Sequence, residues 1–297
     1  MQILIFLQQH VSAIFNTLFI FGPAVMKTFI LTSILLCSFC LPTHSETLDI
    51  QVMADFVPQD GGNPKNEATK FLLAAATELG DEISLRFIPA SRLREWQQLS
   101  KMNNACLYNK LKTPEREAHA VFSQYPIMAF PPNKLVVFNK PTIPDSITLV
   151  QAIFHYDLTI GIVKGRSYSE EIDQFVRLND EHFFIVDGAR NAPRLGQMLF
   201  QNKIDAVLEY QTIFSNRYKR AQDLSSIRYI SLKPEKVAVF GYIACSPTEV
   251  GKQAVALFDK ALKTEKIRTL ISERLMALFH EGENTQIVNA FNAAFEH

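Results

Sequence analysis

The chain lacks an excess of charge of either sign, because 30 lysine and arginine residues balance 30 aspartate and glutamate residues. It also has no run of lysine or arginine. A face that binds nucleic acid normally leaves a basic excess, so we expect no nucleic-acid partner. With 47% hydrophobic and 20% charged residues, the composition is that of a globular protein. The length of 297 residues allows one large or two medium domains.

Cysteine is scarce, and the four cysteines are Cys37, Cys40, Cys106 and Cys245. Cys106 and Cys245 each lie at the end of an apolar, strand-like run. Two alternatives stay open for them: a disulfide in an oxidising compartment, or a pair of buried free thiols. The two residues alone cannot build a zinc site, and no histidine lies at ligand spacing from either one. We therefore expect no metal site.

Motifs of known chemistry are absent as well. The sequence has no P-loop, no G-x-G-x-x-G after the first expected strand and no H-E-x-x-H. His119, His155 and His182 are scattered along the chain, which is more typical of structural or exposed residues than of catalytic ones. We expect no catalytic residue and no cofactor.

Two apolar runs precede the first acidic residue, Glu46. The second run has a charged start at Met26 and Lys27, an apolar middle and small residues at its end, which is typical of a secretory signal cleaved after Ser45. We take Met26 as the start of the protein and residues 1–25 as an upstream extension. A membrane anchor that spans the bilayer twice is the alternative. The signal predicts an exported, periplasmic protein.

Strand and helix patterns alternate along the first half of the remaining chain. The expected strands are 48–54, 83–88, 105–108 and 134–138, and the expected helices are 67–79 and 92–101. A similar unit follows, with strands 158–163, 183–186 and 204–208 and helices ending at 178 and 201, then a strand over 237–245 and three helices over 250–262, 266–279 and 285–295. This order predicts two α/β lobes with parallel sheets, in which ligands gather at the carboxyl ends of the strands.

Arg116 is the first candidate for ligand binding. Thr113 has the hydroxyl of a helix N-cap and Pro114 suits the first helical position, so Arg116 lies on the first turn of a short helix. A guanidinium at a helix N-terminus matches a carboxylate or a phosphate. The alternative is a surface arginine paired with Glu115 or Glu117.

This segment carries a resemblance to a known family. The run 112–117, Lys-Thr-Pro-Glu-Arg-Glu, followed by Phe-Ser at 122–123 and Tyr-Pro at 125–126, resembles a hallmark of family 3 solute-binding proteins. These are two-lobed periplasmic receptors that deliver amino acids and similar solutes to importers. The resemblance implies that Arg116 binds the carboxylate of the ligand, with Thr113 and Tyr125 beside it.

The resemblance also implies a fold and its division into domains. The expected fold is that of a type II periplasmic binding protein, in which two Rossmann-like α/β lobes are joined by a two-strand hinge. Lobe 1 would comprise residues 46–138 and 243–297, and lobe 2 residues 139–242, after the N-terminal extension and signal of residues 1–45. The hinge strands would lie near residues 134–139 and 240–244.

Two further segments resemble the family. The turn at 165–169, Gly-Arg-Ser-Tyr-Ser, is similar to a turn that meets the carboxylate of the ligand from the second lobe, which implies roles for Ser167 and Tyr168. A helix cap is the alternative for Ser167. In the family an aromatic residue after the first strand covers the ligand, so Phe56 is the candidate, with a plain core phenylalanine as the alternative.

The third segment, 202–210, resembles a strand whose final aspartate holds the α-ammonium group of an amino acid. Tyr210 occupies that place here. Glu209 is adjacent, but neighbouring residues of a strand point to opposite faces, so we do not expect it to replace the aspartate. The missing counter-charge argues against an ordinary α-amino acid as the ligand.

The resemblance predicts a function with two alternatives. We expect an exported monomeric receptor that closes on a small, anionic or carboxylate-bearing solute and presents it to a membrane permease. One alternative is an exported lyase or dehydratase-like enzyme of the same fold, with Glu209 as its acid–base group. The other is a ligand-sensing partner of a membrane signalling protein. The predicted ligand-binding residues are Phe56, Thr113, Arg116, Tyr125, Ser167, Tyr168 and Tyr210.

Overall fold

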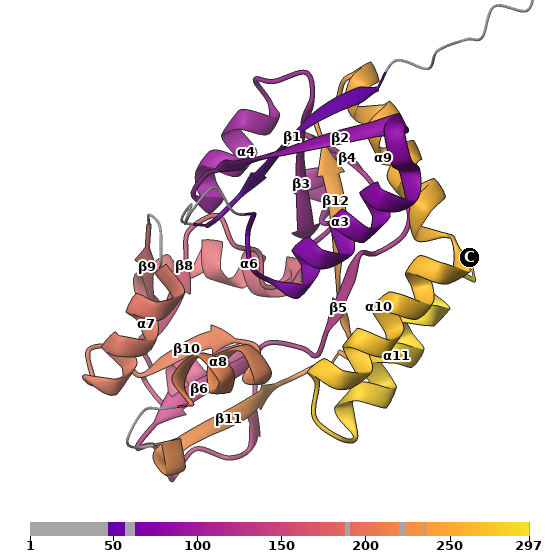
Figure 1. Ribbon diagram of the computed structural model, residues 1–297. Coiled ribbons are helices and arrows are strands. Elements are labelled where there is room, and N and C mark those ends of the chain that lie inside the picture. Colours follow the sequence, from indigo (N-terminus) through magenta and orange to yellow (C-terminus); the bar gives the residue numbers. More distant parts are fainter. Residues whose placement is uncertain (1–46, 57–62, 188–190, 220–223, 235, 297) are drawn as a thin grey trace, which may run out of the picture. The chain divides into compact units, whose positions relative to one another are not determined.

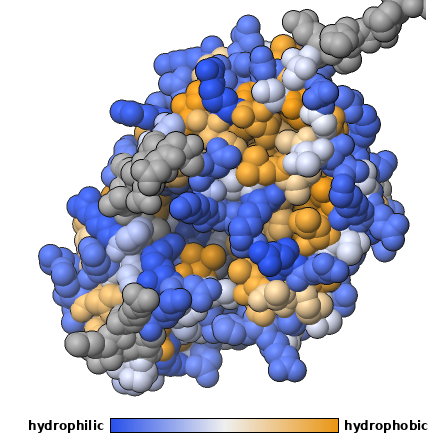
Figure 2. Space-filling model, viewed as in Figure 1, coloured by the Kyte–Doolittle hydropathy of each residue, from blue (hydrophilic) through white to orange (hydrophobic). Residues whose placement is uncertain are grey.

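The computed structural model describes residues 47–56, 63–187, 191–219, 224–234 and 236–296. The expected signal segment and the extension before it lie outside the described residues. The described chain forms two six-stranded sheets with helices packed against them (Figure 1). None of the described helices is both long and apolar enough to cross a membrane. On the face shown in Figure 2, hydrophilic residues cover most of the surface and hydrophobic areas lie among them.

The first sheet has the strand order β2-β1-β3-β12-β4, with β5 paired to β12. Its strands are β1 (Leu48–Ala54), β2 (Ile83–Pro89), β3 (Ala105–Lys110), β4 (Val121–Phe122), β5 (Met128–Phe130) and β12 (Val239–Cys245). β1 is parallel to β2 and β3, and β12 is antiparallel to β3, β4 and β5. The parallel core places the ends of β1 and β3 at one edge of the sheet.

Six helices accompany the first sheet. They are α3 (Glu67–Leu79), α4 (Arg92–Leu99), α5 (Pro114–Glu117), α9 (Glu249–Leu262), α10 (Glu265–Leu278) and α11 (Glu283–Ala293). α3 begins where the side chain of Asn66 accepts the N–H of Thr69 at 2.9 Å, and it ends at Gly80, whose φ is +60°. Its apolar residues recur at helical spacing and are buried, as the periodicity predicts. In Figure 1, α3 lies beside α9 and α10.

The second sheet has the strand order β7-β11-β6-β10-β8-β9. Its strands are β6 (Lys134–Phe138), β7 (Ser146–Ile147), β8 (Ile160–Val163), β9 (Phe183–Val186), β10 (Ala206–Glu209) and β11 (Ile227–Leu232). The helices of this part are α6 (Glu170–Leu178), α7 (Asn191–Phe200) and α8 (Gln211–Tyr218). The parallel strands β8, β9 and β10 form one side of this sheet, and the loops after β8 and β10 leave it at the same edge.

The position of β6 corrects the expected domain boundary. The sequence division assigned Lys134–Phe138 to the first lobe, near the hinge, but β6 pairs with β10 and β11 in the middle of the second sheet. Four of its five residues are buried, as a central strand requires. The chain therefore passes between the sheets at residues 131–133 and again between the end of β11 and the start of β12, and we propose residues 131–133 and 236–238 as parts of the hinge.

Cys106 and Cys245 form a disulfide between the neighbouring strands β3 and β12, where the two residues lie opposite each other. Both residues are buried in the core of the first sheet. The structure thus decides between the two alternatives in favour of the disulfide. The bond joins elements of one sheet, so it leaves the proposed hinge segments free.

Candidate functional site

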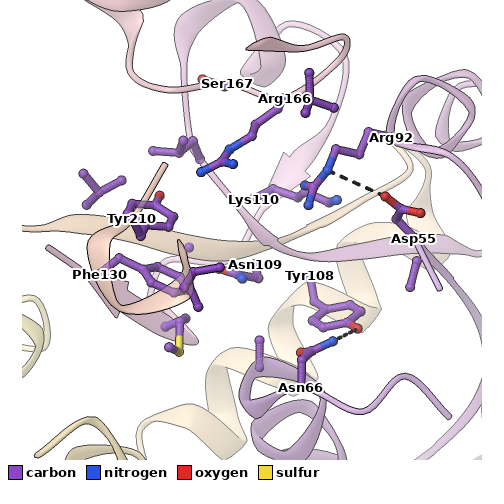
Figure 3. Close-up of a pocket in the computed structure, with 18 of the residues that line it drawn as sticks. Asp55, Asn66, Arg92, Tyr108, Asn109, Lys110, Phe130, Arg166, Ser167 and Tyr210 are labelled. Atoms are coloured by element: carbon purple, nitrogen blue, oxygen red, sulfur yellow. Dashed lines mark hydrogen bonds and ion pairs between the residues drawn. The ribbon is translucent and has the colours of Figure 1, made fainter. Parts of the chain in front are cut away.

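A cavity of about 490 Å³ is lined by residues of both sheets. Asp55 and Phe56 follow β1, and residues 108–111 lie at the end of β3. From the other sheet, residues 165–167 follow β8, and Glu209 and Tyr210 lie at the end of β10. These are the carboxyl ends of parallel strands, where free backbone groups and loops form ligand sites in α/β folds. In Figure 3 the side chains of Arg92 and Lys110 approach each other, and that of Arg166 points toward Tyr210.

Arg116 lines the cavity from the first turn of α5. The predicted cap is present, because the hydroxyl of Thr113 accepts the backbone N–H of Arg116 at 3.4 Å and Pro114 begins the helix. The guanidinium donates to the carbonyl of Leu111 at 3.1 Å and to that of Gly165, beyond β8, at 3.2 Å. It also lies 4.5 Å from the ring centre of Trp96. The side chain therefore connects the two sheets.

The expected surface alternative for Arg116 is not formed. Glu115 pairs with Arg177 at 3.3 Å, and Glu117 lies 3.5 Å from Lys112. No described carboxylate lies within ion-pair distance of Arg116. Burial lowers the pKa of Arg116 to about 10, against the opposing effect of Asp173 and Glu115. The side chain is thus a cation at neutral pH whose close partners are carbonyl groups.

Arg166 and Glu209 form a buried ion pair on the other side of the cavity. The guanidinium of Arg166 lies 2.7 Å from one oxygen of Glu209, and Arg217 lies 3.2 Å from the other. The backbone N–H of Tyr210 also donates to Glu209 at 3.0 Å. Burial acts to raise the pKa of Glu209, but Arg166 and then Arg217 outweigh burial and lower it to about 2. Glu209 is therefore ionised at neutral pH.

Two further ion pairs line the cavity from the side of the first sheet. Glu95 on α4 and Lys110 on β3 form a short, buried ion pair. Burial lowers the pKa of Lys110, and Glu95 opposes this shift. Arg92 lies 3.8 Å from Asp55 (Figure 3).

Five cationic side chains and four carboxylates line the cavity, so their formal charges leave one positive charge. The fourth carboxylate, Glu67, lies 2.6 Å from Lys70 and 3.4 Å from Arg274. Each of the four carboxylates therefore has a cation within 4 Å. The formal charge of the cavity lining is therefore positive by one, and Arg116 is the lining cation that no carboxylate pairs within 4 Å among the described residues.

Comparison with known proteins identifies the fold. An amino-acid transporter substrate-binding protein of Streptococcus pneumoniae, bound to L-arginine, matches with a TM-score of 0.53 and 21% identity, over 85% of this chain and 97% of that one. An ancestral arginine-binding protein matches with a TM-score of 0.57 and 18% identity, over 79% and 99%. This chain has the two-lobed fold of periplasmic binding proteins. The two sheets are therefore called lobe 1 and lobe 2 below.

A third structure of this fold is an ancestral amino-acid-binding protein described as a precursor of cyclohexadienyl dehydratase. It matches with a TM-score of 0.56 and 16% identity, over 79% of this chain and 96% of that one. No protein-family model and no curated protein matches the sequence. The likeness thus confirms the predicted two-lobed α/β fold, and identities this low show the fold alone.

The structure brings four of the seven predicted ligand-binding residues into the cavity lining, namely Phe56, Arg116, Ser167 and Tyr210. The alternative of a helix cap for Ser167 does not hold, since Ser169 caps α6 by accepting the N–H of Ile172 at 3.2 Å. The hydroxyl of Ser167 instead makes a short hydrogen bond to Asp173. That these residues bind a ligand stays a prediction.

Three predicted residues lie outside the cavity lining. Thr113 is buried as the cap of α5. Tyr125 stacks on Phe295 at a ring distance of 4.9 Å, so the chain reversal brings it against the C-terminal segment and not against the cavity. Tyr168 is buried in lobe 2, where its phenol oxygen accepts the N–H of Val163 at 2.9 Å.

Several other residues of the cavity lining were not among the predicted ligand-binding residues, and Glu209 lies differently from the prediction. Glu209 was expected to point away from Tyr210, yet both line the cavity, because β10 ends at Glu209 and the chain turns into α8. Tyr108 and Lys110 lie at the carboxyl end of a predicted strand and could have been found by that rule. No motif indicated the lining residues Arg92, Glu95 and Arg217, and Arg166 lies within the turn at 165–169, where the resemblance pointed to Ser167 and Tyr168 instead.

Proposed function

We propose that this chain is an exported receptor that binds a small carboxylate-bearing solute between its two lobes. The proposal rests on the fold and on a cavity of about 490 Å³ that both lobes line. A volume of this size suits a metabolite-sized solute. The receptor would act as a monomer and present the solute to a membrane transporter, or to a signalling partner.

Arg116 carries the proposal. A guanidinium has five N–H donors, and the two hydrogen bonds to carbonyl groups leave others for a ligand. A carboxylate that accepts from this side chain forms a charge-assisted, bidentate contact, which is among the stronger hydrogen bonds in proteins. Arg116 also donates to the carbonyl of Gly165 in lobe 2, so a solute bound to it would lie beside the contact between the two lobes.

The partners of the other charged groups narrow the class of solute. An α-amino acid needs a carboxylate for its ammonium group, and the cavity carboxylates Asp55, Glu67, Glu95 and Glu209 all have cationic partners of their own. Burying an unpaired ammonium group is costly. We therefore propose a mono- or dicarboxylate without an ammonium group as the solute.

Acid–base catalysis by Glu209 is less well supported. A general acid needs a pKa near the working pH, and the pKa of Glu209 is lowered to about 2. Both of its oxygens accept hydrogen bonds from arginines. The observations on this carboxylate favour binding over turnover.

The test is a thermal-shift screen of the purified protein with monocarboxylates, dicarboxylates, amino acids, phosphorylated solutes and neutral sugars. A solute at about a hundred times its dissociation constant should stabilise the fold by about 2.7 kcal/mol. Arg116→Ala should abolish that shift for any carboxylate. Arg94→Ala is the matched control, because Arg94 is exposed on α4 and lies outside the cavity lining.

Two outcomes would contradict the proposal. A carboxylate that stabilises Arg116→Ala as much as the wild type would remove Arg116 from the site. Stabilisation by neutral sugars alone, unchanged in the variant, would point to a different class of solute.

A further inference from the structure

Arg166 differs from the other cavity arginines in how completely it is enclosed. Its side chain is 11% exposed, and one terminal nitrogen donates to Glu209 at 2.7 Å and to the side-chain oxygen of Asn133 at 3.0 Å. The guanidinium carbon lies 4.7 Å from the ring centre of Tyr168 and 5.2 Å from that of Tyr210. In Figure 3 the guanidinium of Arg166 points toward Tyr210, across the space that the lining residues enclose.

The groups around this guanidinium would form a cation-binding subsite without it. Glu209 supplies a carboxylate that is 6% exposed, and Asn133 supplies a second acceptor. The ring of Tyr210 supplies an aromatic face and is held in place by stacking on Phe130 at 4.6 Å. A carboxylate beside an aromatic face is the arrangement that binds ammonium and guanidinium groups.

We propose that Arg166 is a specificity-determining residue whose guanidinium fills this subsite and thereby excludes solutes that carry an ammonium or guanidinium group. The inference deepens the proposed function and rests on it, since it takes the cavity to be the solute site. The position of the residue supports it, because Arg166 comes from the loop after β8 and lines the cavity together with Glu209. The chain thus supplies its own cation where a cationic solute would bind.

A purely structural ion pair is the competing explanation. In that case the surrounding side chains would close the space left by a truncated Arg166, with Arg217 taking over both oxygens of Glu209, and no free cation would bind there. If Arg166 occupies a subsite, a small guanidinium compound should enter the space and take over its contacts with Glu209 and Asn133. Arg217 leaves that space free, since it binds the other oxygen of Glu209.

The experiment measures the binding of n-propylguanidinium to Arg166→Ala by calorimetry and by the shift in melting temperature. We expect it to bind the variant at least about tenfold more tightly than the wild type. Neutral n-propylurea should bind neither protein. The matched control is Arg228→Ala, which also removes an arginine from an ion pair of lobe 2, with Asp145 at 2.5 Å, but outside the cavity lining. That variant should gain no affinity.

A second variant decides the question if Arg166→Ala does not fold. Arg166→Gln keeps an amide donor for Glu209 and should also bind n-propylguanidinium more tightly than the wild type, by a smaller factor than the alanine variant. Equal binding by the wild type and by the folded variant or variants would overturn the proposal. So would a gain of the same size in Arg228→Ala.

Failure of the proposed function would appear elsewhere. It would show as an absence of carboxylate binding by the wild type, or as carboxylate binding that does not depend on Arg116. Neither result changes the expected binding of n-propylguanidinium to the Arg166 variants. The two proposals can therefore fail separately.

Discussion

Arg116 of lobe 1 and Arg166 of lobe 2 line the same cavity, but their surroundings differ. Arg116 donates to two backbone carbonyls and has no carboxylate partner among the described residues, whereas Arg166 is enclosed by Glu209, Asn133 and two tyrosine rings. Burial lowers the pKa of Arg116 to about 10, while Glu209 outweighs burial and raises the pKa of Arg166. An arginine side chain therefore has no carboxylate partner in lobe 1 and is held in an ion pair in lobe 2. The difference is the presence of Glu209 beside Arg166.

The largest expected effect comes from removing the anion on the lobe 2 side. Glu209→Ala leaves Arg166 buried without a carboxylate partner, which should lower the free energy of unfolding by about 3–5 kcal/mol. Asp145→Ala is the control, because its carboxylate is 95% exposed and its ion pair with Arg228 should contribute about 1 kcal/mol or less. Urea unfolding of both variants measures the difference. Equal losses would mean that burial does not distinguish the two pairs.

The sequence alone predicts the parts of the fold that depend on local pattern. The periodicity of α3 gives its buried face, and the signals at Thr113 and Pro114 give the start of α5. Strand pairing is not local, which explains the misplaced β6 and the open alternatives for Cys106 and Cys245.

The candidate site was predictable only where a motif or a strand end indicated it. Arg116 follows from its motif, but the pairing of Arg166 with Glu209 joins residues 43 positions apart. No spacing in the sequence indicates that contact. The sequence placed Tyr125 beside Arg116 for a related reason. Its stacking partner, Phe295, lies 170 positions further along the chain, and no local pattern indicates that contact.

A smaller effect is expected in the pH dependence of the unfolding free energy, which tests the buried pair of Glu209 and Arg166. The pKa of Glu209 is about 2 in the folded protein, against 4.5 for an unperturbed glutamate, which stands for the unfolded chain. The ionised group therefore stabilises the fold fully above about pH 4.5. This contribution, about 3 kcal/mol, is lost as the pH falls from about 4.5 toward 2. Glu209→Gln should therefore flatten the acid limb of a plot of unfolding free energy against pH.

Glu171 provides the control for this measurement. Its hydrogen bond with Lys236 lowers its pKa to about 2 as well, but its side chain is 64% exposed. Salt at about 0.5 M screens an exposed pair and leaves a buried one largely unchanged. The flattening caused by Glu209→Gln should persist in salt, whereas any effect of Glu171→Gln should disappear. A salt-sensitive effect of Glu209→Gln would contradict the buried pairing.

The smallest loss of stability is expected from an alanine at Gly165, a substitution that tests the contact between the two sheets beside Arg116. Gly165 of lobe 2 has a φ of +78°, and a Cβ atom there would lie 3.1 Å from the backbone nitrogen of Leu93 in lobe 1. Gly282 has a φ of +94° with nothing within 4 Å of its Cβ position, so Gly282→Ala is the matched control. Both substitutions should cost about 1–2 kcal/mol of stability, because both place alanine in the left-handed region.

Only Gly165→Ala should also weaken solute binding, since the added methyl group pushes against α4 and separates the carbonyl of Gly165 from Arg116. We expect a roughly tenfold loss of carboxylate affinity in Gly165→Ala and none in Gly282→Ala, measured by calorimetry. If both variants bind the solute as the wild type does, the contact of Gly165 with lobe 1 does not contribute to closure. The proposed binding of an anion by Arg116 would then depend on lobe 1 alone, and Arg116 and Arg166 would act independently of each other.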